Sequence, residues 1–508
     1  MKHRNDHLLR QHDMEGEGIP EAHTRGLDLE YRAPDLTPDQ VAELPRPILD
    51  GRPEWLELYW RTWAIAFDRV RVPDPSTGFQ PFCDAAFSEH IFQWDTCFLM
   101  GFARFASHAL PVEGTFDNFY AKQHADGFIC REISSLTGDD FWSKEHPSAI
   151  NPPLFADGEW GLYHLTGDVS RIRRVFPLLC RYDDWLRRHR RHGDGVGYWT
   201  TSLASGMDNT PRAFLAGGDD ANRDYGHSWM CLAAQQALSA QKLEKMAALL
   251  GYRERSIALA EERRRIVEYL DQHCWNDELG FYVDRDQEGD PTDVLTPASL
   301  WAILSGAGNE ERWSRTFEIL RSPEHFWRPH ALPSVSAAHP TYFGRGNYWQ
   351  GSVWPPMVVL ALRAARAVGR EGYAIALAMN HLDNLHRVYT QTGTLWENYA
   401  SETASKGNIS RPEFVGWTGC GPIEALIEVI IGLRPTAKGE LTWVSHREDR
   451  HGVENLRVQG KVASLALDPT RSRLEYDVSS DIAVELRRGD TVRTFLLPAG
   501  AGELEVEC

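Results

Sequence analysis

From residue 53 to about residue 435, apolar residues recur at the three- and four-residue spacing of helices, and few segments alternate as strands do. The first such run starts at Pro53, which suits a first helical turn, and carries Trp55, Tyr59 and Trp63 on one face. About a dozen helices in succession argue against a parallel α/β fold, which needs a strand between helices. We expect a mainly α fold, and a toroid of paired helices suits this length.

The expected helices after the first one follow each other with short loops rich in glycine and aromatic residues. They span residues 95–109, 153–166, 170–191, 223–250, 252–274, 296–306, 309–321, 352–369, 371–389 and 420–433. A short capped helix is expected earlier, at Thr37 to Val41. Strand signals in this stretch are short, as at residues 280–284.

After about residue 436 the pattern changes to short alternating segments separated by turns. Strands are expected at residues 441–444, 462–467, 474–478, 482–486 and 491–497, with a turn at Arg488-Gly489-Asp490. We therefore predict three parts: an N-terminal extension over residues 1–52, a helical domain over residues 53–435, and a small C-terminal antiparallel β module over residues 436–508.

Charge and composition restrict the partners of the chain. The 508 residues have a formal net charge of −18 and no basic stripe, which argues against a nucleic-acid partner. Residues 1–18 are polar, and no run reaches the roughly 20 apolar residues of a membrane span, so we expect a cytoplasmic location and no membrane partner. The sequence does not indicate an oligomeric state.

Cysteine and histidine spacing gives no sign of a metal or a cofactor. The eight cysteines form no CxxC pair, so free thiols are expected. The 20 histidines include no HExxH arrangement, and no phosphate-binding glycine motif is present. We expect no cofactor and no transition-metal site, while a calcium ion held by loop carboxylates stays open.

Three carboxylates lie in loops beside aromatic residues. Asp208 lies in Ser205-Gly206-Met207-Asp208-Asn209-Thr210-Pro211-Arg212, Glu397 lies between Trp396 and Tyr399, and Glu413 precedes Trp417. Loops on a rigid scaffold carry catalytic groups more often than other segments do. Two carboxyl groups facing each other across an aromatic-lined pocket are the minimal apparatus for breaking a glycosidic bond.

The loops also concentrate tryptophan, of which the chain has 18. Sugar rings present C–H faces that stack on indole, while carboxylates and amides bind their hydroxyls, so this mixture favours a carbohydrate pocket. Core packing is the alternative for each single tryptophan. The residues concerned are Trp94, Trp160, Trp199, Trp349, Trp354, Trp396 and Trp417.

Five motifs in order resemble those of glycoside hydrolase family 63, and the related trehalases share much of the series. The motifs are Phe92-Gln93-Trp94-Asp95-Thr96, Gly127-Phe128-Ile129-Cys130-Arg131-Glu132, Gly206 to Arg212, Asn347-Tyr348-Trp349-Gln350-Gly351-Ser352-Val353-Trp354 and Trp396-Glu397-Asn398-Tyr399. The small members that look most alike are mannosylglycerate and glucosylglycerate hydrolases. The resemblance implies an (α/α)6 barrel and inverting hydrolysis of an α-glycoside.

By motif position the resemblance makes Asp208 the general acid. It leaves two glutamates for the base: Glu413, in the loop entering the last barrel helix, and Glu397, at the trehalase-like position, with Glu402 a weaker rival. The residues implied to bind substrate are Trp94, Asp95, Arg131, Arg212, Trp349, Gln350, Trp354, Trp396, Tyr399 and Trp417.

The sequence thus predicts an inverting α-glycosidase that acts on a small glucoside or mannoside. One alternative is an (α/α)6 epimerase or lyase that moves a proton with His227, His330 or His339. A second alternative is a carbohydrate-binding protein without turnover.

Overall fold

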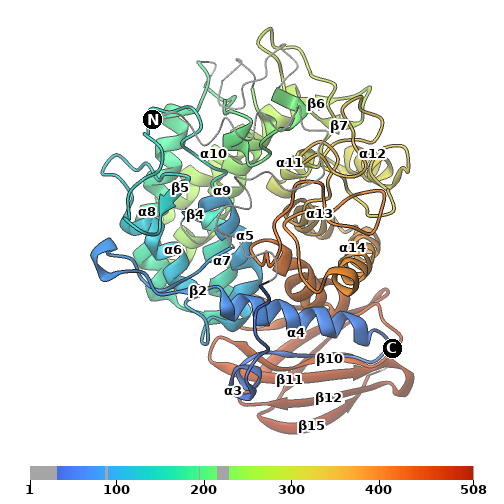
Figure 1. Cartoon of the computed structure of the whole chain (residues 1–508). Helices are drawn as coiled ribbons and strands as arrows, with labels where there is room; N and C mark the ends of the chain where they lie inside the picture. The colour runs from blue at the N-terminus through green and yellow to red at the C-terminus, as the bar shows by residue number, and fades with distance from the viewer. Residues whose placement is uncertain (1–30, 86–89, 194, 214–227, 507–508) are drawn as a thin grey trace.

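The structure is a computed structural model, and it describes residues 31–85, 90–193, 195–213 and 228–506. A helical body carries most of the chain, and two β-sheets lie beneath it (Figure 1). The mainly α prediction with a C-terminal β part is confirmed at this level.

The helices begin and end close to the predicted limits in the described residues. They are α3 Pro38–Glu43, α4 Pro53–Asp68, α5 Gln93–Ala103, α6 Val112–Ala121, α7 Phe155–Thr166, α8 Val169–His189, α9 Met230–Leu249, α10 Arg253–Tyr269, α11 Leu300–Ser305, α12 Glu310–Arg321, α13 Pro355–Ala367, α14 Glu371–Thr392 and the π-helical η9 Gly421–Ile431. The short capped helix predicted at Thr37 to Val41 is present as α3, and Thr37 forms a reciprocal capping box with Gln40 at its start. The sequence analysis missed α6, because Gly114 and Asn118 lower its helix propensity.

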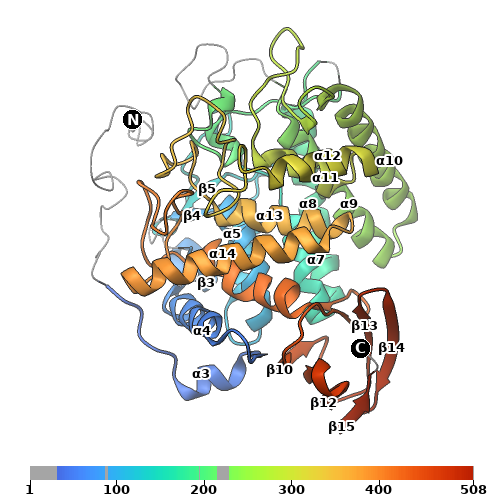
Figure 2. The ribbon, with the colours of Figure 1, turned by 90° about the vertical axis from the view of Figure 1, so that its right-hand side faces the viewer.

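Alternate helices form a closed series of neighbours. Along the chain, α5 packs against α7, α7 against α9, α9 against α11, α11 against α13, and α13 against η9, which returns to α5. The intervening helices lie outside this series: α14 packs against α13, α8 and α10 pack against α9, and α4 packs against α14 (Figure 2). The series therefore forms an inner wall covered by outer helices.

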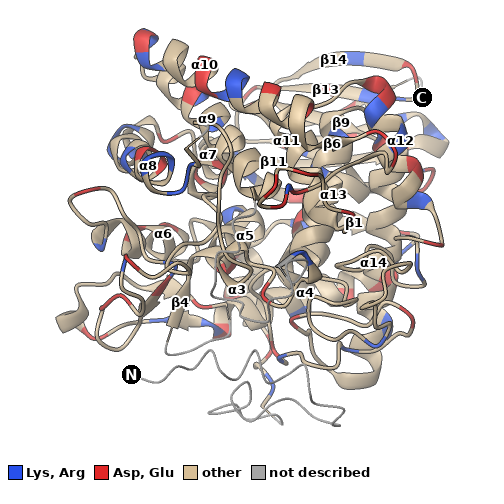
Figure 3. Ribbon diagram, turned by 90° about the horizontal axis from the view of Figure 1, so that it is seen from above, with Lys and Arg blue, Asp and Glu red and all other residues tan. Residues whose placement is uncertain are grey.

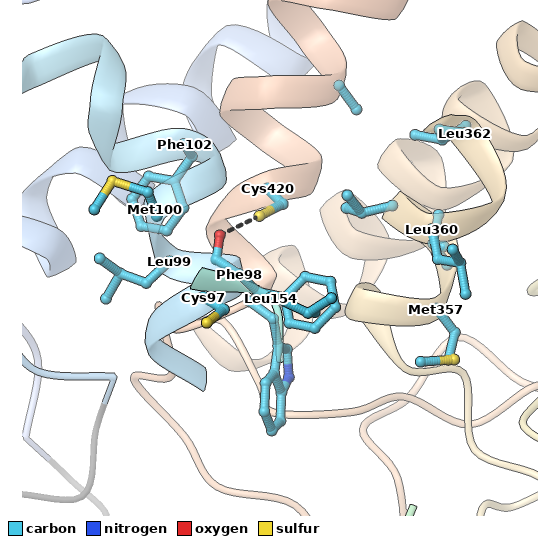
Figure 4. Packing of buried hydrophobic residues seen from close by; sticks show 14 of the residues in the cluster. Cys97, Phe98, Leu99, Met100, Phe102, Leu154, Met357, Leu360, Leu362 and Cys420 are labelled. Atoms are coloured by element: carbon cyan, nitrogen blue, oxygen red, sulfur yellow. Dashed lines mark hydrogen bonds between the residues drawn. The ribbon is translucent and has the colours of Figure 1, made fainter. Parts of the chain in front are cut away.

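Most residues of the inner helices are buried, because these helices are covered on both faces. Every residue of α5 is buried, and Phe98, Met100 and Phe102 face the neighbouring segments (Figure 4). Cys420, the last residue of the helical turn Thr418–Cys420 that leads into η9, donates from Sγ to the carbonyl of Phe98 at 3.0 Å, which ties this turn to α5. The seven described cysteines are buried and none forms a disulfide.

The β part consists of two main sheets. One sheet has the order β1-β10-β11-β12-β15, and the other has the order β14-β13-β9-β8. Their strands are β1 Arg46–Leu49, β8 Leu433–Pro435, β9 Leu441–Val444, β10 His451–Val458, β11 Lys461–Asp468, β12 Arg473–Val478, β13 Ile482–Arg488, β14 Thr491–Leu497 and β15 Gly500–Glu505. Short pairs β2 Val70–Arg71 with β3 Phe82–Cys83, β4 His90–Phe92 with β5 Glu132–Ser134, and β6 Trp275–Asn276 with β7 Phe281–Tyr282 lie within the helical body.

Two features of these sheets differ from the prediction. The module is not wholly antiparallel, because β9 pairs in parallel with β13 from Leu441↔Val484 to Val444↔Arg487. In addition, β1 comes from the predicted N-terminal extension and pairs with β10, with Leu49 opposite His451. The N-terminal segment is therefore an integral edge of the C-terminal sheet.

Two arginine-rich runs, residues 187–191 at the C-terminal end of α8 and residues 263–265 in α10, lie on outer helices that also carry acidic residues (Figure 3). Arg187 and Arg191 of the α8 region both contact Glu262 of α10, and Arg264 pairs with Glu261. Each run therefore has acidic partners, but the first run is not wholly a solvated face, because Arg190 is buried. Among the described residues, no helix is long and apolar enough to cross a bilayer.

Candidate active site

Three carboxyl groups from distant parts of the chain interact electrostatically in the helical body. Asp95 lies in the first turn of α5, Asp208 lies between η4 Leu203–Ser205 and η5 Pro211–Ala213, and Glu397 lies in the loop after α14. The charges of Glu397 and Asp208 both raise the pKa of Asp95, and the charge of Asp208 raises that of Glu397. The sequence analysis placed these three residues at one site, and the structure brings them together as the acidic cluster.

Burial sets the protonation of the acidic cluster. Removal from water raises the pKa of Asp208 to about 6, against the opposing charge of Arg131. Burial and the two neighbouring carboxylates raise the pKa of Asp95 well above its ordinary value. The site therefore holds protons on carboxyl groups close to neutral pH.

Glu397 is 1% exposed and is held from several sides. Burial raises its pKa to about 7, although the Arg411 guanidinium favours the charged form. The backbone N–H of Arg411 donates to Oε2 at 3.3 Å, and the Tyr348 hydroxyl donates to Oε1 at 3.5 Å. The Trp417 indole N–H donates to the Glu397 carbonyl at 2.7 Å, which fixes the backbone. Both carboxylate oxygens thus face a donor.

Trp94 and Asp95 present polar atoms suited to a ligand. The indole Nε1 of Trp94 and Oδ1 of Asp95 are buried, and neither has a hydrogen-bond partner among the described residues. Unpaired buried polar atoms are costly unless something binds them. The Trp94 ring lies against Gly206 of the acid loop, where a Cβ would come within 2.8 Å of the ring and where φ is +80°. Gly206 thus permits this close contact.

Arg131 lies beside the acidic cluster. Its Nη1 donates to the carbonyl of Leu203 at 2.7 Å, and its side chain is buried. Its charge lowers the pKa of both Asp95 and Asp208. Arg131 therefore steadies the loop before Asp208 and partly offsets the cluster's negative charge.

Asn209, directly after Asp208, joins the acid loop to residues 347–350. Its side chain accepts from the Trp349 backbone N–H at 2.7 Å and donates to the Asn347 carbonyl at 3.2 Å, while its own carbonyl accepts from Gln350 Nε2 at 3.1 Å. Three hydrogen bonds from one residue hold the two loops in register. We call this arrangement the Asn209 clamp.

The tryptophans expected at the sugar from this segment are packed inside. Trp349 and Trp354 stack with ring centroids 4.0 Å apart and planes 3° from parallel, and both are at most 1% exposed. Trp354 also contacts Trp417 edge-on at 5.6 Å. In this arrangement Trp349, Gln350 and Trp354 support the loop that carries Tyr348.

Glu413 lies in a different environment. Its carboxylate contacts Arg61 of α4 at 3.1 and 3.2 Å, accepts from the Ala33 backbone N–H at 3.0 Å, and accepts from the Thr394 hydroxyl at 2.5 Å. Its φ of +49° is in the left-handed region. These contacts make Glu413 an anchor between α4, the N-terminal segment and the loop after α14.

The remaining expected substrate residues make internal contacts. Arg212 pairs with Asp284 through Nε and Nη2 at 2.6 and 2.7 Å and is 2% exposed. The Tyr399 hydroxyl accepts from the Trp396 backbone N–H at 2.9 Å, and the Trp396 indole donates to Thr392. Arg212 thus braces the acid loop, and Trp396 and Tyr399 shape the loop around Glu397.

The alternative bases are engaged elsewhere or lie outside the described residues. His330 contacts the ring of His381 at 2.9 Å in a buried pair, and His339 contacts the Thr341 hydroxyl. His227 lies outside the described residues. Glu402 pairs with Arg328 at 2.6 Å.

Two further features are the presence or absence of metal-ligand groups among the described residues and a surface hollow. Within the described residues, no group of three or more His, Cys, Asp or Glu side chains has the arrangement of a metal site. A surface hollow of about 470 Å³ is lined by residues 125–126 and by arginines of α8 and α10, at a place separate from the acidic cluster.

Sequence reasoning missed Tyr348, Arg411 and Asn209. Each lies within two residues of a residue that it did select: Tyr348 precedes Trp349, Arg411 lies two residues before Glu413, and Asn209 follows Asp208. The motifs contained the signal, but only the contacts show which neighbour faces Glu397.

Comparisons with known proteins give the class and the family. The class of protein is glycoside hydrolase, as the family match shows. The acidic loops beside buried aromatic residues fit this class. The family model described as the mannosylglycerate hydrolase MGH1-like glycoside hydrolase domain matches residues 88–418. The chain belongs to this family, within glycoside hydrolase family 63.

Three relatives show how far the likeness extends. A probable mannosyl-oligosaccharide glucosidase of Schizosaccharomyces pombe is 26% identical over 420 residues, which cover 64% of this chain and 48% of that protein. The structure of a family 63 mannosylglycerate hydrolase from Thermus thermophilus with glucose has a TM-score of 0.59 at 19% identity, covering 72% and 99% of the two chains. A structure described as a sialidase has a TM-score of 0.70 at 14% identity, covering 97% of this chain and 44% of that one.

Proposed function

We propose that the protein is an inverting glycosidase that hydrolyses an α-linked glucoside or mannoside of small size, with Asp208 as general acid and Glu397 as general base. The observation that carries the proposal is the acidic cluster itself: two carboxyls with pKa values raised to about 6 and about 7, coupled by charge. Glycosidases of this kind use such a pair, one group protonated and one ionised.

We also propose that the helical body is an (α/α)6 barrel. The closed series α5, α7, α9, α11, α13 and η9 would be its inner wall, and the outer helices its second layer. Asp95 lies at the start of α5 and Trp417 directly before the helical turn that leads into η9, so the site would lie at one end of the barrel.

The hydrogen-bond partners support the division of roles. Glu397 faces a donor at each oxygen, from Arg411 and Tyr348, and an ionised carboxylate can only accept. Asp208 is taken as the acid from its motif position, and burial raises its pKa to about 6 against the charge of Arg131. Because the pKa of Glu397 is higher, at about 7, the active form is the fraction of the protein in which Asp208 is protonated and Glu397 is ionised. Glu413, held by Arg61 and two donors, is assigned to structure and not to the base.

The reaction follows from these roles. Asp208 gives its proton to the glycosidic oxygen as the bond from that oxygen to the anomeric carbon breaks. Glu397 takes a proton from a water whose oxygen attacks the anomeric carbon from the opposite face. The product has the inverted anomeric configuration, and proton exchange with solvent restores both carboxyls.

The substrate class rests on the relatives and on Trp94 and Asp95. The relatives include a mannosylglycerate hydrolase and a mannosyl-oligosaccharide glucosidase, so a mannosyl or glucosyl unit is the proposed sugar. The buried indole N–H of Trp94 and Oδ1 of Asp95 offer one donor and one acceptor for its hydroxyls.

A panel of α- and β-linked glucosides and mannosides, with product anomers followed by NMR, tests the proposal. Wild type should release the β-anomer first from an α-glycoside, and Asp208→Asn and Glu397→Gln should be nearly inactive. Glu413→Gln is the matched control and should keep the stereochemical outcome. Release of the α-anomer, or an active Glu397→Gln, would refute the assignment.

Leaving-group dependence separates the acid from the base. An α-glycosyl fluoride needs little protonation, so Asp208→Asn should cleave it far better than it cleaves an alkyl glycoside. With Glu397→Ala, added azide should attack the anomeric carbon of the α-glycosyl fluoride, displace fluoride and give the β-glycosyl azide. If azide rescues the Asp208 variant and not the Glu397 variant, the base is Asp208 and the acid is Glu397, the reverse of the proposed roles.

A further inference from the structure

We propose that Tyr348 is a positioning residue of the hydrolysis proposed above, whose phenol hydroxyl holds the Glu397 carboxylate in the orientation that receives the proton of the attacking water. The inference rests on the proposed function and adds a residue to it. The inference is based on the hydrogen bond from Tyr348 to Glu397, on the left-handed backbone of Tyr348, and on the packing that holds this backbone in place.

The contact involves one specific oxygen. The Tyr348 hydroxyl donates to Oε1 of Glu397 at 3.5 Å, and the Arg411 backbone N–H donates to Oε2 at 3.3 Å. Two donors on different oxygens fix the rotation of the carboxylate about its last side-chain bond. Because each oxygen has a second lone pair, one remains for water.

The backbone at Tyr348 is unusual for a residue of its type. Its φ is +57°, in the left-handed region that bulky residues avoid, and Gly346 two residues earlier has φ +82°. Such conformations persist only where the surroundings enforce them, and they cluster at active sites. The strain is accounted for if the turn serves to aim this side chain at Glu397.

The surroundings of Tyr348 do enforce the turn. The Trp354 indole N–H donates to the Tyr348 carbonyl at 3.0 Å, and the two rings meet edge-on with centroids 4.8 Å apart. Trp349, the next residue, stacks on Trp354 and is held through its backbone by Asn209. The Asn209 clamp therefore ties the position of Tyr348 to the loop of the acid.

The hydroxyl stays a donor throughout the working range. Burial and the charges of Glu397, Asp208 and Asp95 raise the pKa of Tyr348 well above its ordinary value. A neutral phenol among three carboxyls donates a hydrogen bond without adding charge. This suits a group that orients a base and does not itself exchange a proton.

Tyr348→Phe tests the inference, since it removes one oxygen and keeps the ring. We expect kcat to fall about tenfold to hundredfold, as for loss of a hydrogen bond to a charged group, with KM within about twofold of wild type. The alkaline limb of the pH–rate profile should move to higher pH, because Glu397, whose pKa is the higher of the two, loses a donor to its charged form. Tyr373→Phe, on α14 with its hydroxyl buried away from the cluster, should match wild type.

A second measurement does not depend on turnover. The free energy of unfolding is measured against pH with and without Glu397→Gln, and the difference is plotted. The midpoint of this difference should lie at higher pH when the pair is made in the Tyr348→Phe background than when it is made in wild type. Unchanged kcat and an unmoved midpoint would overturn the inference, and a raised KM with normal kcat would make Tyr348 a substrate contact instead. An active Glu397→Gln would refute the proposed function, which is a separate outcome.

Discussion

Replacing Glu397 by glutamine should change the pH dependence of stability in a calculable way. The pKa of Glu397 is raised from 4.5 to about 7 in the folded protein, chiefly by burial. A carboxyl whose folded pKa is raised contributes stability that is fully present below the unfolded pKa and is lost as pH rises through the folded value. Glutamine does not titrate, so the free energy of unfolding of the variant does not show the decrease with rising pH that Glu397 causes in wild type.

The size of the effect follows from the shift. A shift of about 2.5 units at about 1.36 kcal/mol per unit gives a change of about 3 kcal/mol in the stability difference. The variant should therefore gain about 3 kcal/mol on wild type between pH 4.5 and pH 8, with most of the gain between pH 5 and pH 7. Whatever constant difference the substitution also causes does not affect this change.

Urea unfolding followed by tryptophan fluorescence at several pH values measures this difference. Glu402→Gln is the control, because Arg328 and Tyr342 lower the pKa of Glu402 by hydrogen bonding. That group stabilises above its unfolded pKa, and the contribution is lost as pH falls, so its curve should have the opposite sign. A difference for Glu397→Gln that stays flat from pH 4.5 to pH 8 would refute the claim that the carboxyl is buried among like charges.

Four further results are expected. The rate should be highest between pH 6 and pH 7, falling at lower pH as both carboxyls become protonated and at higher pH as both become ionised; a plateau up to pH 9 would contradict the assignment. Asn209→Ala should lower kcat by roughly a hundredfold in steady-state kinetics because the Asn209 clamp sets the loop geometry, and it should also lower Tm because the Trp349 backbone N–H loses its acceptor. Glu413→Ala should cost about 3 kcal/mol in urea unfolding, since Arg61 loses its buried partner, and should leave the pH profile in place. Gly206→Ala should weaken sugar binding in calorimetry by displacing the Trp94 ring, whereas Gly251→Ala, at a similar φ with open space around it, should not.

The helices were predictable from sequence because their apolar spacing is regular and their caps are local. The segment Pro53–Asp68 shows this, with its buried Trp55, Tyr59 and Trp63 on one face. The strand His451–Val458 was missed because Gly452 and the polar residues from Glu454 to Asn455 break its alternation. Strand β1 was missed because four residues starting Arg-Pro give no local signal, and its partner is about 400 residues away.

The sequence predicts which loops carry the site residues, but it does not predict which glutamate has which role. Asp208 and Glu397 were selected by motif, but Glu397 and Glu413 were not separable, since both lie in irregular loops beside aromatic residues. Their difference depends on partners distant in sequence: Arg61 for Glu413, and Tyr348 for Glu397. Contacts of that range have no periodic signature.

The pairing of β1 with β10 bears on how the chain is made. Residues 46–49 leave the ribosome early, but their partner strand is synthesised much later, so this edge of the sheet can close only when most of the chain is available. Until β1 pairs with it, β10 presents unpaired backbone groups, a place where another copy of the chain can add a strand. Expression of the protein without residues 31–52 should therefore yield aggregates, and supplying that segment as a separate peptide should reduce them.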